Sequence, residues 1–173
     1  GSDDLENLQS ICRECHKRKT AFESAEGRAK AMPEWLPKPT IPVTVVCGPP
    51  ASGKSTYVAK HASVNDLVLD IDVIASQLTG KTLYDSTFNE RIQAIRVRNK
   101  LLASLSGPCD YKHCWLIVTA NSESKRDWWR DKLDAKLVVL DTDKRECLER
   151  LAADVTRSAE AKRRARQAIL DWC

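Results

Sequence analysis

The amino-acid sequence predicts an α/β domain in which helices cover both faces of a parallel sheet. Short runs of β-branched residues alternate with longer stretches of helical character, which is the pattern of βαβ units. These runs are apolar throughout, as in parallel strands buried on both faces. A glycine-rich phosphate-binding pattern directly follows the first run, at the edge where such sheets bind ligands.

The elements can be placed in order along the chain. Four runs have the length and β-branched composition of buried strands, so we expect strands at 43–47, 67–69, 115–118 and 137–140. Proline is missing from residues 54–105 and 109–173, where polar and apolar residues are mixed. We therefore expect helices at 54–61, 73–78, 86–105, 123–133, 143–153 and 159–172.

Three parts make up the expected domain organisation. Residues 33–42 contain four prolines, which forbid a continuous helix and predict a linker. Residues 1–32 are charged and too poor in apolar residues for a core of their own, so they predict a short helical segment. Residues 43–173 form the α/β domain.

Composition narrows the class of protein. The chain has 173 residues, of which 42% are hydrophobic and 30% charged, enough for one domain with a core. Its longest apolar stretch, 41–50, is far shorter than the roughly 20 residues of a membrane helix. The seven cysteines follow no secretory leader, which indicates a reducing cytosol. We expect a cytoplasmic protein with no membrane partner, whose net charge of +4 permits an anionic one.

The segment from Gly48 to Ser55 fits the phosphate-loop pattern G-x-x-x-x-G-K-[ST], between a predicted strand and a predicted helix. Backbone N–H groups of such a loop surround a phosphate, and the positive end of the helix points at the anion. Lys54 would reach the β- and γ-phosphates, and the Ser55 hydroxyl would ligate Mg²⁺. The residues expected to hold the nucleotide are Gly48, Pro50, Ala51, Ser52, Gly53, Lys54, Ser55 and Thr56. The alternative is a Gly/Pro-rich turn that caps the helix and binds nothing.

Two aspartates follow the second predicted strand. If the chain stayed extended, Asp70 and Asp72 would leave the sheet on the same side at its carboxyl edge. A carboxylate there accepts a proton from an attacking hydroxyl or holds Mg²⁺ through water. The alternative is that one of them caps the helix expected near Val73.

These residues resemble a known group of enzymes. The segments 45–56 and 67–72, with the arginine-rich C-terminal helices, resemble the small P-loop kinases, most closely the bacteriophage polynucleotide 5′-kinase and its zeta toxin and AAA_33-like relatives. The resemblance covers about residues 41–173 and implies a P-loop kinase-like fold that uses ATP or another nucleoside triphosphate with Mg²⁺. It aligns Asp72 with the general base that activates the acceptor hydroxyl.

The same resemblance implies roles for three arginines. Arg150 and Arg157 occupy the stretch of the lid that covers the transferred phosphate, and their spacing leaves open which one acts. Arg126 falls where relatives carry another phosphate or acceptor contact. The chain departs from many P-loop enzymes at 117–121, where no aspartate follows the third strand, so Mg²⁺ would depend on Ser55 with Asp70 or Asp72.

Other basic and aromatic groups have two interpretations each. Gln93, Arg96 and Lys100 share a face of the helix expected at 86–105, which either follows a nucleic-acid backbone or is simply solvated. The basic cluster at 162–166 belongs to a helix with an apolar stripe, which favours packing. Trp128 and Trp129 could stack a base, but adjacent helical residues cannot share a face, so at least one should pack inward.

The first residues resemble a different family. Residues 7–20 resemble the C-terminal part of an HNH endonuclease motif, in which Asn7 would be the middle Asn, His16 a metal ligand, and Cys12 with Cys15 half of a zinc site. The first catalytic His and the other cysteine pair are missing ahead of Asn7. Replacement ligands would have to come from Cys109, His113 or Cys114. We therefore expect neither stoichiometric zinc nor nuclease activity from this sequence.

The function predicted from the sequence is an ATP- and Mg²⁺-dependent phosphotransferase that acts on 5′-hydroxyl ends of nucleic acid. Two alternatives stay open: a kinase for a nucleoside or other small hydroxyl compound, and a P-loop ATPase or nucleotide-binding module coupled to DNA binding. The missing aspartate after the third strand favours a kinase, because a hydrolytic motor would hold Mg²⁺ and its attacking water there.

Overall fold

The computed structural model describes residues 31–173. The chain divides into two units, Gly1–Pro33 and Glu34–Cys173, and the second unit is described here. The predictions for the helical segment and for the zinc remnant at Cys12, Cys15 and His16 lie outside the described residues.

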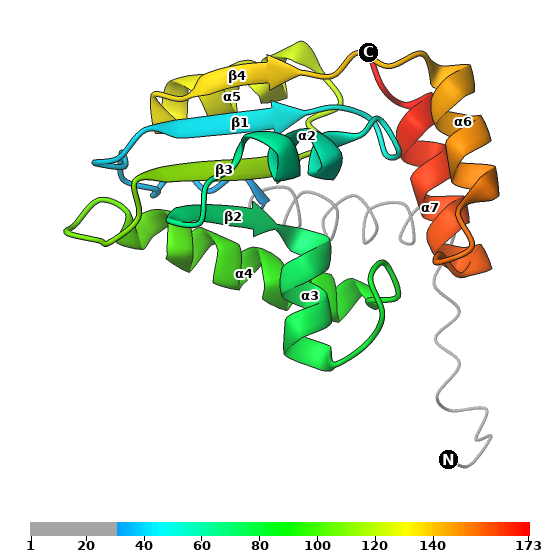
Figure 1. Cartoon of the computed structure of the whole chain (residues 1–173), viewed down its shortest axis with the longest axis horizontal. Helices are drawn as coiled ribbons and strands as arrows, with labels where there is room; N and C mark the ends of the chain where they lie inside the picture. Colours follow the sequence, from blue (N-terminus) through cyan, green and yellow to red (C-terminus); the bar gives the residue numbers. More distant parts are fainter. Residues whose placement is uncertain (1–30) are drawn as a thin grey trace, which may run out of the picture. The chain divides into compact units, whose positions relative to one another are not determined.

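Four strands and six helices alternate along the second unit (Figure 1). The strands are β1 (Val43–Cys47), β2 (Asp66–Asp70), β3 (His113–Val118) and β4 (Lys136–Val139). The helices are α2 (Lys54–His61), α3 (Ile71–Thr79), α4 (Phe88–Ser104), α5 (Glu123–Leu133), α6 (Lys144–Ala153) and α7 (Ala159–Leu170). Every predicted element is present, with ends that differ by a few residues.

The sheet is parallel throughout, in the order β2-β3-β1-β4. All five residues of β1 are buried, whereas the edge strands β2 and β4 are partly exposed. This is the burial expected of a parallel strand between two neighbours with both faces covered.

Helices cover both faces of the sheet, as the sequence predicted. Figure 1 shows α2 on the near side of the sheet and α5 on the far side. Helix α4 lies next to α5, since the Arg98 guanidinium is 4.9 Å from the ring of Trp129. Val58 of α2 packs against Val46 and Ile117, which point to the α2 side.

The last two helices pair at the carboxyl end of the strands, toward which the arrows of β1, β2 and β3 point in Figure 1. Cys147 and Leu151 of α6 pack against Ala165 and Ile169 of α7, and Ala51 of the phosphate loop joins this cluster. The helix pair is therefore held directly against the loop that follows β1.

The proline-rich stretch contains no helix or strand in residues 33–42, as its prolines require. It nevertheless packs on the α/β unit: Leu36 is buried, and the backbone N–H of Thr40 donates to the Leu105 carbonyl at 2.7 Å. Trp128 donates to the Glu34 carboxylate at 2.8 Å.

One element begins in a different place for a reason that matters to the site. The helix expected near Val73 begins at Ile71, because the Asp70 side chain caps it by accepting the Asp72 backbone N–H at 2.9 Å. Asp72 is therefore helical, and the extended-chain reasoning that placed both aspartates on one side of the sheet was wrong. Both aspartates lie at the carboxyl edge of the sheet, because Asp70 is the N-cap of α3 and Asp72 lies in its first turn.

Candidate active site

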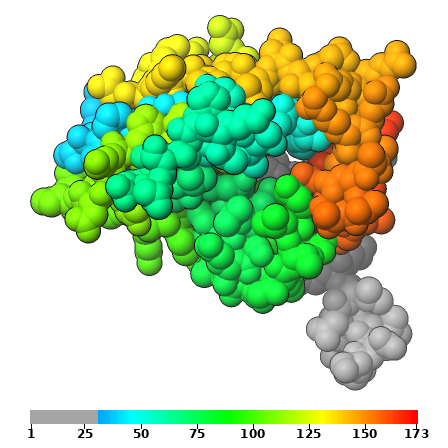
Figure 2. All heavy atoms as spheres, in the orientation of Figure 1, coloured from blue at the N-terminus to red at the C-terminus, as the bar shows by residue number. Residues whose placement is uncertain are grey.

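A cleft of about 980 Å³ opens at the carboxyl end of the sheet. Figure 2 shows the surface hollowed between α2, the segment before α4, and α6. The lining includes the phosphate loop Pro50–Thr56, both aspartates after β2, and four arginines, which are Arg91, Arg150, Arg157 and Arg164. This excess of positive charge around a loop of backbone N–H groups suits a polyanionic ligand.

The phosphate loop needs its glycines for two different reasons. Gly53 has φ +92°, in the left-handed region that glycine tolerates best. At Gly48 there is no space for a side chain, because a Cβ would lie 2.5 Å from the Ser52 hydroxyl oxygen and 2.9 Å from the Leu140 carbonyl oxygen. The buried Ser52 hydroxyl has no hydrogen-bond partner within residues 31–173, which is consistent with a loop whose polar groups serve a ligand.

Lys54 begins α2 and turns back over the loop. Its ammonium donates to the carbonyls of Gly48 at 2.8 Å and Pro49 at 2.7 Å. Burial lowers the pKa of Lys54 to about 8, although the nearby Asp70 carboxylate opposes this change. The charged lysine is thus held at an electrostatic cost that a bound anion would offset.

Ser55 and Asp70 form the oxygen pair beside the lysine. The Ser55 hydroxyl donates to Asp70 Oδ2 at 3.3 Å, and burial raises the pKa of the Asp70 carboxyl. Hydroxyl and carboxylate oxygens are the hard ligands that Mg²⁺ prefers, and this ion takes its other ligands from substrate phosphates and water. The donors present fit Mg²⁺, with Ser55 and Asp70 as the residues that would hold it.

Asp72 lies on the first turn of α3 and has an arginine partner. Its Oδ1 accepts a hydrogen bond from Arg91 Nη1 of α4 at 2.6 Å, and the two side chains keep 27% and 37% of their surface exposed. The pair is thus open to the cleft on one side. Asp72 does not cap the helix, since that role belongs to Asp70.

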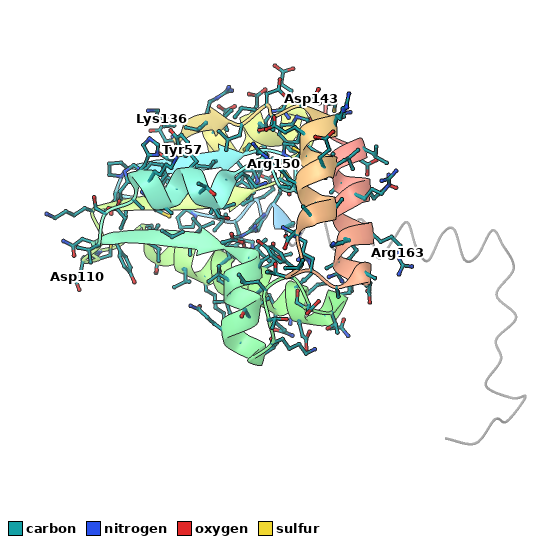
Figure 3. All side chains as sticks on the ribbon, turned by 45° about the vertical axis from the view of Figure 1, so that its right-hand side comes forward. Tyr57, Asp110, Lys136, Asp143, Arg150 and Arg163 are labelled. Carbon is teal, nitrogen blue, oxygen red and sulfur yellow. The ribbon has the colours of Figure 1, made fainter. Side chains whose placement is uncertain are left out.

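Arg150 and Arg157, the two arginines expected in a lid, have different surroundings. Arg150 Nη1 donates to the carbonyl of Ala51 in the phosphate loop at 3.2 Å, and Figure 3 shows this side chain on the side of α6 nearer α2. Arg157 is occupied by Asp154, at 2.8 Å, and by the ring of Tyr84, whose centroid is 3.4 Å from the guanidinium carbon. Arg150 also has a carboxylate partner, Glu146 at 2.5 Å, and of the two arginines it is the one in direct contact with the phosphate loop.

The loop between α3 and α4 is tied to α7 at a strained residue. Tyr84 has φ +74°, which is unfavourable for a side chain of its size. Arg164 Nη2 donates to the Tyr84 carbonyl at 2.8 Å, and its Nη1 donates to the Ser86 carbonyl at 3.2 Å. Contacts of this kind are what keeps a strained conformation in place.

Residues 43–173 match the AAA domain family, AAA_33, and this range is well over half of the chain. The chain belongs to this AAA domain family. It is a family of P-loop kinase-like proteins, so the protein is a P-loop nucleotide-binding kinase or ATPase, of a class that generally uses Mg²⁺. Residues 1–22 match the HNH endonuclease family over a short stretch. No curated protein matches the chain.

The AAA domain brings together most of the predicted site residues, and Arg126 is the exception. Its Nη1 donates to the carbonyls of Ala120 at 3.2 Å and Cys173 at 2.8 Å, and its guanidinium carbon lies 4.8 Å from the Trp172 ring. Arg126 does not line the cleft, which is a correction to its expected placement. At the end of β3 the cleft is lined by Thr119, where many P-loop enzymes have an aspartate.

Three cleft residues of the AAA domain were missed at the sequence level. Arg91 and Arg164 sit within the charged helices α4 and α7, where no local pattern distinguishes them from solvated neighbours. Tyr84 lies in a loop that carries no motif. They reach the cleft only because α4 packs on α3 and α7 reaches the loop before α4.

The other candidate groups serve the surface or the core. Gln93, Arg96 and Lys100 are exposed on α4, as both interpretations of this helix face require. Trp129 is buried, as expected for one of the adjacent tryptophans, and the apolar stripe of α7 is buried as well. Within residues 31–173 no group of three or more His, Cys, Asp or Glu is arranged to hold a metal, so Cys109, His113 and Cys114 do not form a centre there.

None of the helices in residues 31–173 combines the length and the apolar character that a membrane-spanning helix requires.

Proposed function

We propose that the protein is an ATP- and Mg²⁺-dependent kinase that transfers the γ-phosphate to 5′-hydroxyl ends of nucleic acid. The observation that carries the proposal is the placement of Asp72, whose carboxylate opens into the same cleft as the phosphate loop. A hydrolytic site would need only a positioned water, whereas this cleft is also lined by arginines outside the phosphate loop, among them Arg91 and Arg164. Arginines there suit an acceptor with phosphates of its own.

The phosphate loop and Lys54 do the binding in this mechanism. The loop N–H groups hold the phosphates, and the Lys54 ammonium turns from the carbonyls of Gly48 and Pro49 to the β/γ-oxygens, where charge develops during transfer. Ser55 and Asp70 would hold Mg²⁺, which when bound neutralises phosphate charge. Thr142 supports the loop from outside, by donating to the Ser52 carbonyl at 3.1 Å.

Asp72 receives the proton in the transfer step. The acceptor hydroxyl donates its proton to the Asp72 carboxylate as its oxygen bonds to the γ-phosphorus, and the bond from that phosphorus to the bridging oxygen breaks. Arg91 holds the carboxylate in place through the 2.6 Å contact to Oδ1. This leaves Oδ2 to face the hydroxyl.

The decisive experiment compares three acceptors with labelled γ-phosphate: a 5′-hydroxyl oligonucleotide, a nucleoside and water. We expect rapid transfer to the oligonucleotide and slow release to water. Faster transfer to the nucleoside would replace the proposal by a small-molecule kinase, and release to water alone would replace it by an ATPase.

Arg150 is expected to act in the transfer itself. Arg150→Ala should lower kcat by about 10²-fold, because an arginine that reaches the phosphate stabilises the charge of the transition state. Arg157→Ala should change kcat far less, since the contacts of Arg157 are to Asp154 and Tyr84, whereas Arg150 donates to the phosphate loop. Arg145→Ala is the matched control on α6, because Arg145 is exposed and pairs with Glu149 outside the cleft. A larger loss of kcat in Arg157→Ala than in Arg150→Ala would contradict this assignment.

The pKa of Lys54 predicts how nucleotide affinity depends on pH. In the nucleotide-free protein this pKa is about 8, below the ordinary value of 10.5, so the lysine is largely charged at pH 7 and half charged near pH 8. ADP affinity should therefore begin to fall between about pH 7 and pH 8 and continue to fall toward pH 10. Calorimetric titration measures this, and Lys54→Ala should bind ADP weakly with no such decline. An equally steep decline in the variant would assign it to another group.

A further inference from the structure

Within residues 31–173, α2 is the helix that covers the near face of the sheet in Figure 1. Helix α2 has 8 residues and packs over Val46 and Ile117, near the carboxyl ends of the strands. Two residues earlier on each strand, toward the amino ends, the register aligns four residues on this same side of the sheet: Val68, Trp115, Thr44 and Lys136. Thr44 is buried there, but Val68 is 43% exposed and Trp115 is half-buried. This stretch of the α2 face is open along the edge strand β2.

Four aromatic rings gather on this open stretch, and we call Tyr57, His61, His113 and Trp115 the stacking cluster. Tyr57 and His61 of α2 stack with ring centroids 4.1 Å apart. The ring centroids of His113 and Trp115 of β3 are 4.9 Å apart. The rings of Tyr57 and Trp115 are arranged edge to face, with centroids 6.4 Å apart. His61 is exposed and the other three rings are half-buried, so the cluster presents ring surface to solvent.

The charge around the stacking cluster is positive. Lys60, Lys112 and Lys136 are exposed around it. The nearest carboxylate, Asp66, accepts at Oδ2 from Trp115 Nε1 at 3.0 Å and from the Ser63 backbone N–H at 2.9 Å, so one of its oxygens is bound to the protein. The bonds from the Ser63 N–H and the Trp115 ring hold the pKa of Asp66 below its ordinary value. Figure 3 shows the other nearby acid, Asp110, at the tip of the loop before β3.

The stacking cluster is continuous with the cleft. Tyr57 and Lys60 also line the cleft, so the two regions share residues of α2. Along the edge, β2 runs from Asp66 beside the cluster to Asp70 beside the phosphate loop. Its five residues span roughly 13 Å at about 3.3 Å per residue, which is the length of a few nucleotides.

We infer that the stacking cluster binds unpaired bases of the acceptor strand, a few nucleotides away from the 5′-hydroxyl at Asp72. Exposed rings next to lysines are the arrangement by which proteins bind single strands without sequence preference, because every base has a face that can stack. The inference rests on the proposed function, since it names the acceptor as single-stranded rather than as a free nucleoside. The three lysines supply the charge complementarity to its backbone.

The test measures binding without nucleotide, by fluorescence anisotropy, for a 5′-hydroxyl mononucleotide and for single strands of about four and about eight nucleotides. The wild type should bind the longer strands at least about tenfold more tightly than the mononucleotide. His61→Ala and Trp115→Leu should each remove most of this gain and leave mononucleotide binding unchanged. His61 is exposed, so its variant keeps the test valid even if Trp115→Leu does not fold.

Trp35→Ala is the matched control. Trp35 is 62% exposed, and it lies in the proline-rich stretch whose Glu34 contacts Trp128 of α5, on the other face of the sheet. It should bind all strands like the wild type. Equal affinity of His61→Ala and Trp35→Ala for the longer strands would overturn the inference. So would a dimer in light scattering that dissociates in His61→Ala, which would make the cluster a contact between copies.

The two proposals fail separately. If longer strands bind through the cluster but no acceptor receives phosphate, the kinase proposal falls and the single-strand surface stands. If oligonucleotides are phosphorylated while the cluster variants bind them like the wild type, the surface falls and the kinase stands.

Discussion

Lys54→Ala is expected to lower phosphoryl transfer by about 10³-fold or more. The ammonium is the charged group nearest the loop carbonyls of Gly48 and Pro49, so it is placed to meet the β/γ-oxygens when nucleotide enters. Removing a preorganised charge from a transition state with developing negative charge costs about 10²–10³-fold even for a single neutral donor. The measurement is kcat with saturating nucleotide and oligonucleotide.

The fold should survive this substitution. Burial disfavours the charged form of Lys54, which is why its pKa is about 8, so the side chain contributes little to stability. The melting temperature of Lys54→Ala should equal or exceed that of the wild type. Lys100→Ala, at an exposed position on α4, serves as the control and should keep full activity. Transfer by Lys54→Ala at more than about a tenth of the wild-type rate would contradict the kinase mechanism.

The parts of the site that were predicted from the sequence are those whose functional groups belong to consecutive residues. The phosphate-binding groups of the loop from Gly48 to Ser55 belong to neighbouring residues, so the sequence pattern alone predicts how they are arranged. Strand composition likewise predicted the sheet, because a buried parallel strand is apolar at nearly every position. The position of Lys54 follows from both.

The parts that escaped prediction depend on how the elements pack. Asp72 and Arg91 are 19 residues apart and meet only because α3 and α4 lie side by side. Arg98 is almost fully buried in α4, against the general tendency of arginine, because Trp129 of α5 provides a ring for its guanidinium. Arg126 follows the strand as the resemblance implied, but Trp172 and the Cys173 carbonyl hold it away from the cleft.

The start of α3 shows how one cap changes a prediction. The prediction for Asp70 and Asp72 assumed an extended chain, in which side chains alternate between the two faces of the sheet. In the structure the Asp70 carboxylate accepts the Asp72 N–H and caps a helix that begins there. The same carboxylate also accepts from Ser55, so one side chain serves the helix and the oxygen pair beside Lys54. A cap and a metal ligand are therefore compatible roles at Asp70.

Asp72→Asn is the second substitution with a large expected effect, a loss of transfer of about 10²–10⁴-fold, as is typical for a general base. The asparagine keeps the size of the side chain and an oxygen that can accept from Arg91, but it cannot take the acceptor proton. Because the Asp72 and Arg91 side chains are partly exposed, weakening their ion pair should cost at most about 1 kcal/mol of stability. Asp134→Asn is the control, since Asp134 has φ +50°, which asparagine also tolerates.

Three measurements on Asp72→Asn separate the roles that the geometry allows. If Asp72 is the base, kcat falls while the affinity for Mg·ATP stays near that of the wild type. If it holds Mg²⁺ through water instead, affinity and rate fall together, and raising the metal concentration restores part of the loss. If it serves only the contact between α3 and α4, the melting temperature falls while kcat and affinity persist. This last result would remove Asp72 from the catalytic residues, and with it the observation on which the kinase proposal rests.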